Sequence, residues 1–182
     1  MSLTNPTTLN SAHQIGRAVS SLSKAIQEDE RKAHTVFKTK SELSDGLLAK
    51  ISSRQFDYYS DEPSVLGGND KAPTPTELLL GALCACQEIV VKAYAVTLNI
   101  PINKIEVEAS GELDLRGFLN LHKDIRPGFH TVHFSTTIDT TETDTTKLEK
   151  LKILTEEQCP VLDVIQNPVS VKGSIQFQNS TN

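Results

Sequence analysis

The residues of this chain best suited to covalent chemistry are its three cysteines, Cys84, Cys86 and Cys159. A thiolate is a nucleophile, and the sulfenic acid that a peroxide makes of it condenses with a second thiol to a disulfide. An odd number of cysteines in a reducing compartment favours free or transiently reacting thiols over a disulfide framework. The alternative is that each cysteine is a small buried apolar residue.

Two of the cysteines fall on a segment with strong helix signals, Pro75–Val96. Thr74 is a suitable N-cap, proline is tolerated at the first helical position, and Glu77 completes a capping box. Residues 78–86 are all apolar or small, which predicts a helix buried almost all round. Because one small sheet would not cover so much apolar surface, we expect a homodimer built largely from these helices and the N-terminal hairpins.

The two cysteines of this helix face different surroundings. At about 100° per residue, Cys84 and Cys86 lie roughly 200° apart and cannot be bridged to each other. Cys84 shares its side with Glu88, which is expected to pair with Lys92 and to take no part in chemistry. Cys86 shares its face with three apolar residues, Leu79, Leu83 and Val90.

The remaining patterns predict an α+β fold with mostly antiparallel strands and helices packed on one face. Alternating apolar residues predict strands, and apolar residues at helical spacing predict helices. We place an N-terminal tail and amphipathic helix at residues 1–34 and the main domain at residues 35–182. The predicted elements are helices at 11–33, 75–96, 144–158 and 161–165, and strands at 35–43, 47–59, 105–115, 129–139 and 169–177, with a turn at 44–46 and loops at 61–73 and 116–127.

Composition and charge limit the classes of molecule that this protein is expected to bind. The chain has 182 residues, an apolar content of 37% and a net charge of −5, without a basic stripe. This balance argues against nucleic acid or an anionic membrane as the main partner. Neither a signal sequence nor an apolar run of membrane-spanning length is evident, so we expect a cytoplasmic protein. His122, His130 and His133 lack metal-ligand spacing, and neither a metal nor another cofactor is expected.

Several short motifs recur in an order and spacing that resemble one family. The resemblance covers about residues 35–178 and leaves out the N-terminal helix. The motifs are Asp61-Glu62-Pro63, Leu66-Gly67-Gly68, Pro75-Thr76-Glu77-Leu78-Leu79-Leu80, Ala85-Cys86, Asp114-Leu115-Arg116-Gly117, Pro127-Gly128-Phe129 and Cys159-Pro160-Val161. On these motifs the chain resembles the OsmC/Ohr family, the osmotically induced and organic hydroperoxide resistance proteins.

The resemblance implies a fold and an activity. The fold would be OsmC-like, with antiparallel sheets packed on a long buried central helix in an intertwined homodimer. The activity would be a thiol-dependent peroxidase that reduces organic hydroperoxides in oxidative-stress defence. Cys86 would be the peroxidatic cysteine and Cys159 the resolving one, with an external dithiol as reductant, whereas Cys84 matches no role in the pattern.

The chain departs from the family pattern at two positions. Active members place a glutamate ten positions before the peroxidatic cysteine and an arginine of the N-terminal hairpin beside it. Here Thr76 stands ten positions before Cys86, Glu77 stands nine before it, and Arg54 is the only hairpin arginine. Glu77 and Arg54 are therefore candidate site residues, against the alternatives of a helix cap and an exposed strand residue. The alternative function is a weak or inactive OsmC-like dimer that binds a small apolar ligand.

Overall fold

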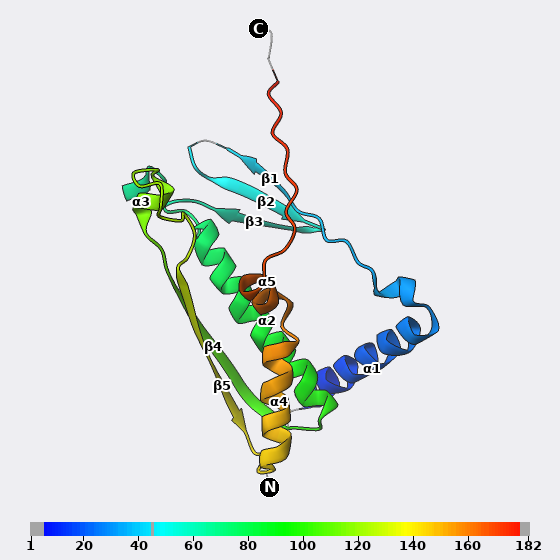
Figure 1. The fold of residues 1–182 in the computed structure, drawn as a ribbon. Coiled ribbons are helices and arrows are strands. Elements are labelled where there is room, and N and C mark those ends of the chain that lie inside the picture. The colour runs from blue at the N-terminus through cyan, green and yellow to red at the C-terminus, as the bar shows by residue number, and fades with distance from the viewer. Residues whose placement is uncertain (1–5, 45, 179–182) are drawn as a thin grey trace.

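A 23-residue helix, α2 (Pro75–Thr97), runs through the middle of the molecule, with the other elements arranged around it (Figure 1). The computed structural model describes residues 6–44 and 46–178, with side chains from residue 11 onward. The helix begins as its sequence predicts. Thr74 Oγ1 accepts a hydrogen bond from the Glu77 N–H at 3.2 Å, and the Glu77 carboxylate accepts one from the Thr74 N–H at 2.7 Å.

Helix α2 packs against a two-stranded antiparallel sheet, β4 (Ile102–Glu112) and β5 (Thr131–Thr140). The predicted alternation is confirmed, because the apolar positions of both strands are half-buried and the polar positions between them are exposed. Strand β4 ends three residues before the predicted end. Asp114 instead accepts the N–H of Arg116 and so caps a short helix, α3 (Leu115–Phe118), in the predicted loop.

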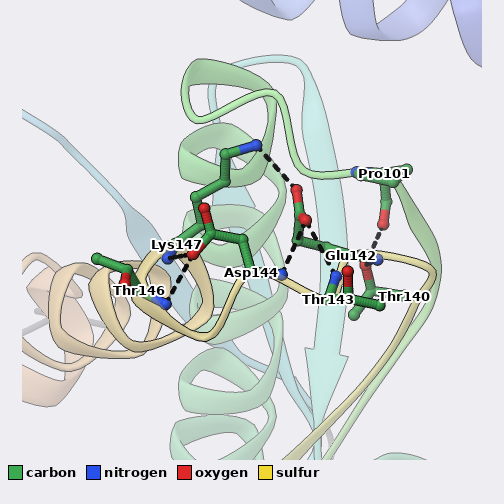
Figure 2. A network of polar contacts seen from close by, with 7 residues as sticks. All are labelled: Pro101, Thr140, Glu142, Thr143, Asp144, Thr146 and Lys147. Carbon is green, nitrogen blue, oxygen red and sulfur yellow. Dashed lines mark hydrogen bonds and ion pairs between the residues drawn. The ribbon is translucent and has the colours of Figure 1, made fainter.

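Two further helices, α4 (Thr145–Glu157) and α5 (Pro160–Gln166), pack on α2 and agree with the predicted ranges. The start of α4 is fixed by a polar network shown in Figure 2. Asp144 accepts the backbone N–H groups of Thr146 and Lys147, and Lys147 Nζ lies 2.9 Å from the carboxylate of Glu142. These contacts hold the end of the β4–β5 sheet next to α4.

The hydrophobic core lies along one side of α2 in two clusters. One contains Leu83, Val90, Cys159 and Leu162, and the other contains Val91, Ala95, Ile100 and Leu151. By length and composition α2 also resembles a membrane span, with a mean hydropathy of 1.6. Its packing against β4, β5, α4 and α5 makes it a core helix instead. The prediction that it is buried almost all round is wrong for the single chain, since Leu79 and Ile89 are 42% and 68% exposed.

A second sheet, β1 (Lys40–Leu43), β2 (Ala49–Ser53) and β3 (Phe56–Ser60), is antiparallel and separate from the first. Residues 47–59 were predicted as one strand, but the chain turns back at Arg54, which has φ 55. No glycine or asparagine marks that turn in the sequence, which is why the pattern predicts a continuous strand. The predicted turn at 44–46 does join β1 to β2, although Asp45 lies outside the described residues.

The N-terminal helix, α1 (Pro6–Glu28), begins before the predicted Ser11 and ends before the predicted Ala33. Asp29, with φ −153, leaves the helical conformation and accepts the Arg31 N–H, which starts the short helix η1 (Glu30–Ala33). Helix α1 contacts α2, and Gly16 lies close to Val96.

The predicted last strand at 169–177 is wrong for the single chain. Residues 168–178 belong to no strand, and Val171, Ile175 and Phe177 are each more than four-fifths exposed. The alternation that predicts this strand is real, but a strand forms only where another strand offers hydrogen bonds. Within the described chain, this segment finds none.

Candidate active site

The structure brings Cys86 and Cys159 together, 73 positions apart in the sequence. Both are free thiols, and the Cys159 thiol donates a hydrogen bond to Cys86 Sγ across 3.2 Å. A disulfide bond is about 2.05 Å long, so a movement of roughly 1 Å would allow the two sulfurs to bond. This is the one pair of predicted site residues in direct contact within the described part of the chain.

Each cysteine is held by a different kind of element. Cys86 lies in the middle of α2, which the capping box and its core side chains fix in place. Cys159 is the N-cap of α5, directly after Gln158, the C-cap of α4. Pro160 occupies the first position of α5, where its missing N–H costs nothing. The Cys159 side chain is only 1% exposed, among Leu83, Val90 and Leu162.

The surroundings of Cys86 favour the neutral thiol. Burial raises the pKa of Cys86 above the ordinary cysteine value, and the neighbouring Cys159 raises it further. A hydrogen bond from the backbone N–H of Val161 acts in the opposite direction and lowers the pKa. Within the described chain, no lysine or arginine contributes to lowering it. The single chain therefore holds two reactive partners in position without yet supplying a cation for the thiolate.

Cys84 projects from another side of α2, as its position in the sequence predicts. Burial raises its pKa, and the negative charge of Glu88 raises it further. The predicted ion pair between Glu88 and Lys92 is absent among the described side chains. Its sequence spacing permits such a pair, but each side chain can also remain solvated at little cost. Glu88 acts instead as an electrostatic neighbour of Cys84.

Glu77 caps the start of α2 through one of its carboxylate oxygens. Its carboxylate accepts the Thr74 N–H and the Thr74 hydroxyl at 2.7 and 3.0 Å, and these contacts lower its pKa. Nine residues of helix separate it from Cys86, a rise of roughly 13 Å. No contact between Glu77 and the cysteine pair is present in the described chain, so its observed contacts are those of a cap.

Arg54 lies in the turn between β2 and β3. Its guanidinium carbon sits 5.2 Å from the centroid of the Phe56 ring, a cation–π contact. The predicted alternative, an exposed strand residue, is wrong in its detail because Arg54 is a turn residue. In the part of the chain that the structure describes, Arg54 makes no contact with Cys86 or Cys159.

The sequence did not reveal the role of Asp61, a buried carboxylate in the loop that leads to α2. Asp61 is 1% exposed and accepts the backbone N–H groups of Glu62, Asn69 and Lys71. Burial alone would raise its pKa, but these hydrogen bonds outweigh burial and lower it. Gly68 is required beside it, because a Cβ there would lie 1.8 Å from the Glu62 carbonyl oxygen. The loop is thereby locked where it enters the cysteine helix.

Two motifs of the 111–129 region also hold the fold. Asp114 pairs with Arg116, whose side-chain hydrogen bonds lower the Asp114 pKa to about 2. A Cβ on Gly117 would lie 2.4 Å from the backbone oxygen of Arg126, so only glycine fits there. Within the described residues, no group of three or more His, Cys, Asp or Glu side chains could hold a metal ion. The absence of a cofactor stays a prediction.

The geometry defines a class of protein: an α+β protein with two opposed free thiols between a long central helix and the start of a later one. A family model for OsmC-like proteins matches residues 68–174, more than half of the chain. The chain therefore belongs to the OsmC family. No curated protein matches the sequence.

Solved structures support the fold. The OsmC-like protein of Mycoplasma pneumoniae has a TM-score of 0.62 at 19% identity, covering 74% of this chain and 89% of its own. An organic hydroperoxide resistance protein OsmC, a predicted redox protein from Legionella pneumophila, has a TM-score of 0.52 at 19% identity, with coverages of 76% and 94%. An organic hydroperoxide resistance protein from Elizabethkingia anophelis has a TM-score of 0.52 at 14% identity, with coverages of 74% and 91%.

Proposed function

We propose that this protein is a thiol-dependent peroxidase that reduces organic hydroperoxides, with Cys86 as the peroxidatic and Cys159 as the resolving cysteine. The observation that carries the proposal is the 3.2 Å separation of the two sulfurs, from elements far apart in the sequence. The apolar residues around the pair suit an organic rather than a purely aqueous peroxide. Family membership and the names of the structural neighbours support the same chemistry.

In the proposed reaction, Cys86 loses its proton and its thiolate attacks one oxygen of the hydroperoxide. The O–O bond breaks, the alcohol leaves with a proton, and Cys86 becomes a sulfenic acid. Cys159 then attacks the Cys86 sulfur, a disulfide forms and water leaves. An external dithiol returns both cysteines to thiols and is itself oxidised to a disulfide. The Val161 N–H would stabilise the Cys86 thiolate in the first step.

A homodimer forms part of the proposal. The uncovered side of α2 carries apolar residues, including Ile89, and residues 168–178 expose an alternating apolar pattern. In a homodimer, a second copy of the chain would cover both regions. The apolar surface that the single chain exposes to water would then be buried. The same assembly could bring Arg54 to a Cys86 thiolate, since the β2–β3 turn is not packed on α2 in the single chain. Glu77 would keep its capping role.

We further propose a cytoplasmic location, where a reducing environment keeps all three cysteines free as they are in the structure. The natural function would be oxidative-stress defence. The reductant would be a cellular dithiol rather than a bound cofactor.

A second candidate function is a binding module, and one specific observation favours it. The Cys86 pKa is raised in the single chain, and a neutral thiol among apolar side chains suits ligand binding rather than catalysis. Such a module would hold a small apolar ligand beside α2 and use Cys86 as a vestigial or sensing thiol.

The test is the consumption of cumene hydroperoxide with dithiothreitol as reductant, compared with hydrogen peroxide at the same concentration. The peroxidase proposal expects catalytic turnover that is faster with the organic peroxide. Peptide mapping should then show a Cys86–Cys159 disulfide and a free Cys84. Three unmodified thiols after excess cumene hydroperoxide would instead support the binding module.

A further inference from the structure

We propose that the external dithiol attacks Cys86 Sγ of the oxidised protein, so that the mixed disulfide forms on Cys86 and Cys159 is the leaving thiol. The inference rests on the proposed function only in taking the Cys86–Cys159 disulfide as the form to be reduced. It assigns which of the two sulfurs the reductant attacks. The short distance between Cys86 Sγ and Cys159 Sγ does not by itself decide this.

Access distinguishes the two sulfurs. Cys159 is 1% exposed and belongs to the buried cluster with Leu83 and Leu162, whereas Cys86 is only half-buried. On the helical wheel of α2, Cys86 stands at a boundary. Buried Leu83 and Val90 lie to one side of it, and the exposed Ala82, Ala85 and Ile89 lie to the other. In the single chain, a thiol can therefore approach Cys86 from this side without opening the core. The proposed homodimer would cover part of this side, so in the dimer the reductant would use the same route to Cys86 that the hydroperoxide requires.

Reaction geometry supports the same choice. A thiolate that breaks a disulfide approaches the attacked sulfur from the side opposite the leaving sulfur. For attack at Cys159, that route leads through the cluster that contains Leu162 and the junction of α4 and α5. For attack at Cys86, the approach lies away from Cys159. The hydroperoxide must also reach Cys86, so the proposed reaction already requires a route to this sulfur and none to Cys159.

The exchange balances in two steps. The first thiolate of the dithiol bonds to Cys86 Sγ, the Cys86–Cys159 bond breaks, and its electron pair leaves on Cys159, which takes up a proton. The second thiol of the reductant loses its proton and attacks the reductant's own sulfur in the mixed disulfide. The reductant leaves as a cyclic disulfide, and Cys86 is released as a thiolate, ready for the next hydroperoxide.

The decisive experiment uses the full chain carrying Cys84→Ser, so that the third thiol cannot capture the probe. Diamide, rather than a peroxide, forms the Cys86–Cys159 disulfide. Brief exposure to glutathione, a monothiol that cannot complete the second step, is followed by N-ethylmaleimide and peptide mapping. The expected result is glutathione on Cys86 in several-fold excess, with N-ethylmaleimide on Cys159. Glutathione mainly on Cys159 would overturn the inference, and so would failure of diamide to form the disulfide.

A matched pair of variants tests the approach route by the rate of dithiothreitol reduction. Ala82 lies one turn before Cys86 on the exposed side, and exposed Gln158 adjoins Cys159. Ala82→Phe should slow reduction several-fold, whereas Gln158→Phe should leave the rate unchanged. The opposite pattern would contradict attack at Cys86. Because the disulfide is made without peroxide, these results do not depend on peroxidase activity. If the protein were an active peroxidase but carried glutathione on Cys159, this inference would be refuted and the proposed function would stand.

Discussion

The two sheets of this protein differ in what covers them. Strands β4 and β5 pack one face on α2, and their residues alternate between half-buried and exposed. In the β1–β3 sheet, all four residues of β1 and four of the five in β3 are exposed. Both are well-paired antiparallel sheets. Backbone pairing thus does not by itself make a core, since burial depends on a second layer.

The difference divides the molecule into a covered part and an uncovered part. The covered part consists of α2, α4, α5 and the β4–β5 sheet, and it contains both site cysteines. The uncovered part consists of the β1–β3 sheet, the outer part of α1 and residues 168–178, which expose many large apolar side chains. The covered part positions both thiols within the single chain. The uncovered part exposes apolar side chains of the kind that mark interaction surfaces.

The largest expected effect lies in the covered part. Cys86→Ser should abolish hydroperoxide consumption, because a hydroxyl cannot replace the thiolate nucleophile. Cys159→Ser should allow a single turnover and then leave Cys86 as an over-oxidised or trapped sulfenic acid. Stopped-flow consumption of cumene hydroperoxide with intact-mass analysis measures both. Cys84→Ser is the control and should turn over normally. A Cys84–Cys159 disulfide in the wild type would reassign the nucleophile.

The next effect compares the stability of the two parts. Leu83→Ala removes a fully buried side chain from the covered core and should lower the free energy of unfolding by about 2–5 kcal/mol. Tyr58→Ala, at a β3 side chain that is 41% exposed, should cost much less at protein concentrations where the chain is monomeric. Urea unfolding followed by circular dichroism measures both. Equal losses would show that the β1–β3 sheet is covered after all.

A third prediction concerns the side of α2 that the single chain leaves exposed, where Ile89 lies. The wild type should sediment as a dimer at micromolar concentration, and Ile89→Asp should sediment as a monomer, because a buried unpaired carboxylate is costly. Ser110→Asp, on the exposed face of β4, introduces the same charge and should leave the dimer intact. A wild-type monomer in sedimentation equilibrium would remove the dimer from the proposal.

A smaller effect is expected in the pH dependence of Cys86. Since its pKa is raised in the folded chain, alkylation by iodoacetamide should accelerate as the pH rises above the ordinary range of a cysteine. The raised pKa of Cys86 also makes the free energy of unfolding depend on pH. Burial of the neutral thiol stabilises the fold fully below the unfolded pKa, and this stabilisation is lost as the pH rises through the folded pKa. Mass spectrometry of native and urea-unfolded protein gives the two profiles. A native profile shifted to lower pH would indicate a cation at Cys86.

The smallest effect is expected at Glu88. Glu88→Gln removes the charge that raises the Cys84 pKa, so alkylation of Cys84 should begin at slightly lower pH. Peroxide turnover and the melting temperature should stay as in the wild type, because Glu88 makes no ion pair with Lys92 in the described chain. If turnover were lost at an unchanged melting temperature, Glu88 would belong to the site.

Local signals explain what the sequence could predict. The start of α2 is fixed by the contact between Thr74 and Glu77, three residues apart, so it can be read directly. The alternation of β4 likewise reports one covered face. The pairing of Cys86 with Cys159 could be predicted only from the family resemblance, because spacing in the sequence cannot show a contact across 73 positions.

The misses have physical causes of their own. Asp29 ends α1 by binding Arg31, a contact that competes with the helix and leaves its apolar stripe unchanged. Arg54 turns the chain without a glycine, and residues 169–177 have a strand pattern without a neighbouring strand in the described chain. Asp61 belongs to a motif of the family resemblance, but its role is not visible in the sequence, because its partners are backbone groups, which every residue carries. The boundary at residue 34 stays a prediction.

The position of Cys159 between two helices has a thermodynamic consequence for the oxidised protein. A disulfide between Cys86 and Cys159 would close a loop of 73 residues and tie the junction of α4 and α5 to the middle of α2. Closing a loop of that length restricts the unfolded chain by roughly 4 kcal/mol in the chain-entropy account. The oxidised form would then resist urea and proteases better than the reduced form. In a cell short of reductant, this protein would therefore accumulate in its more stable, oxidised form.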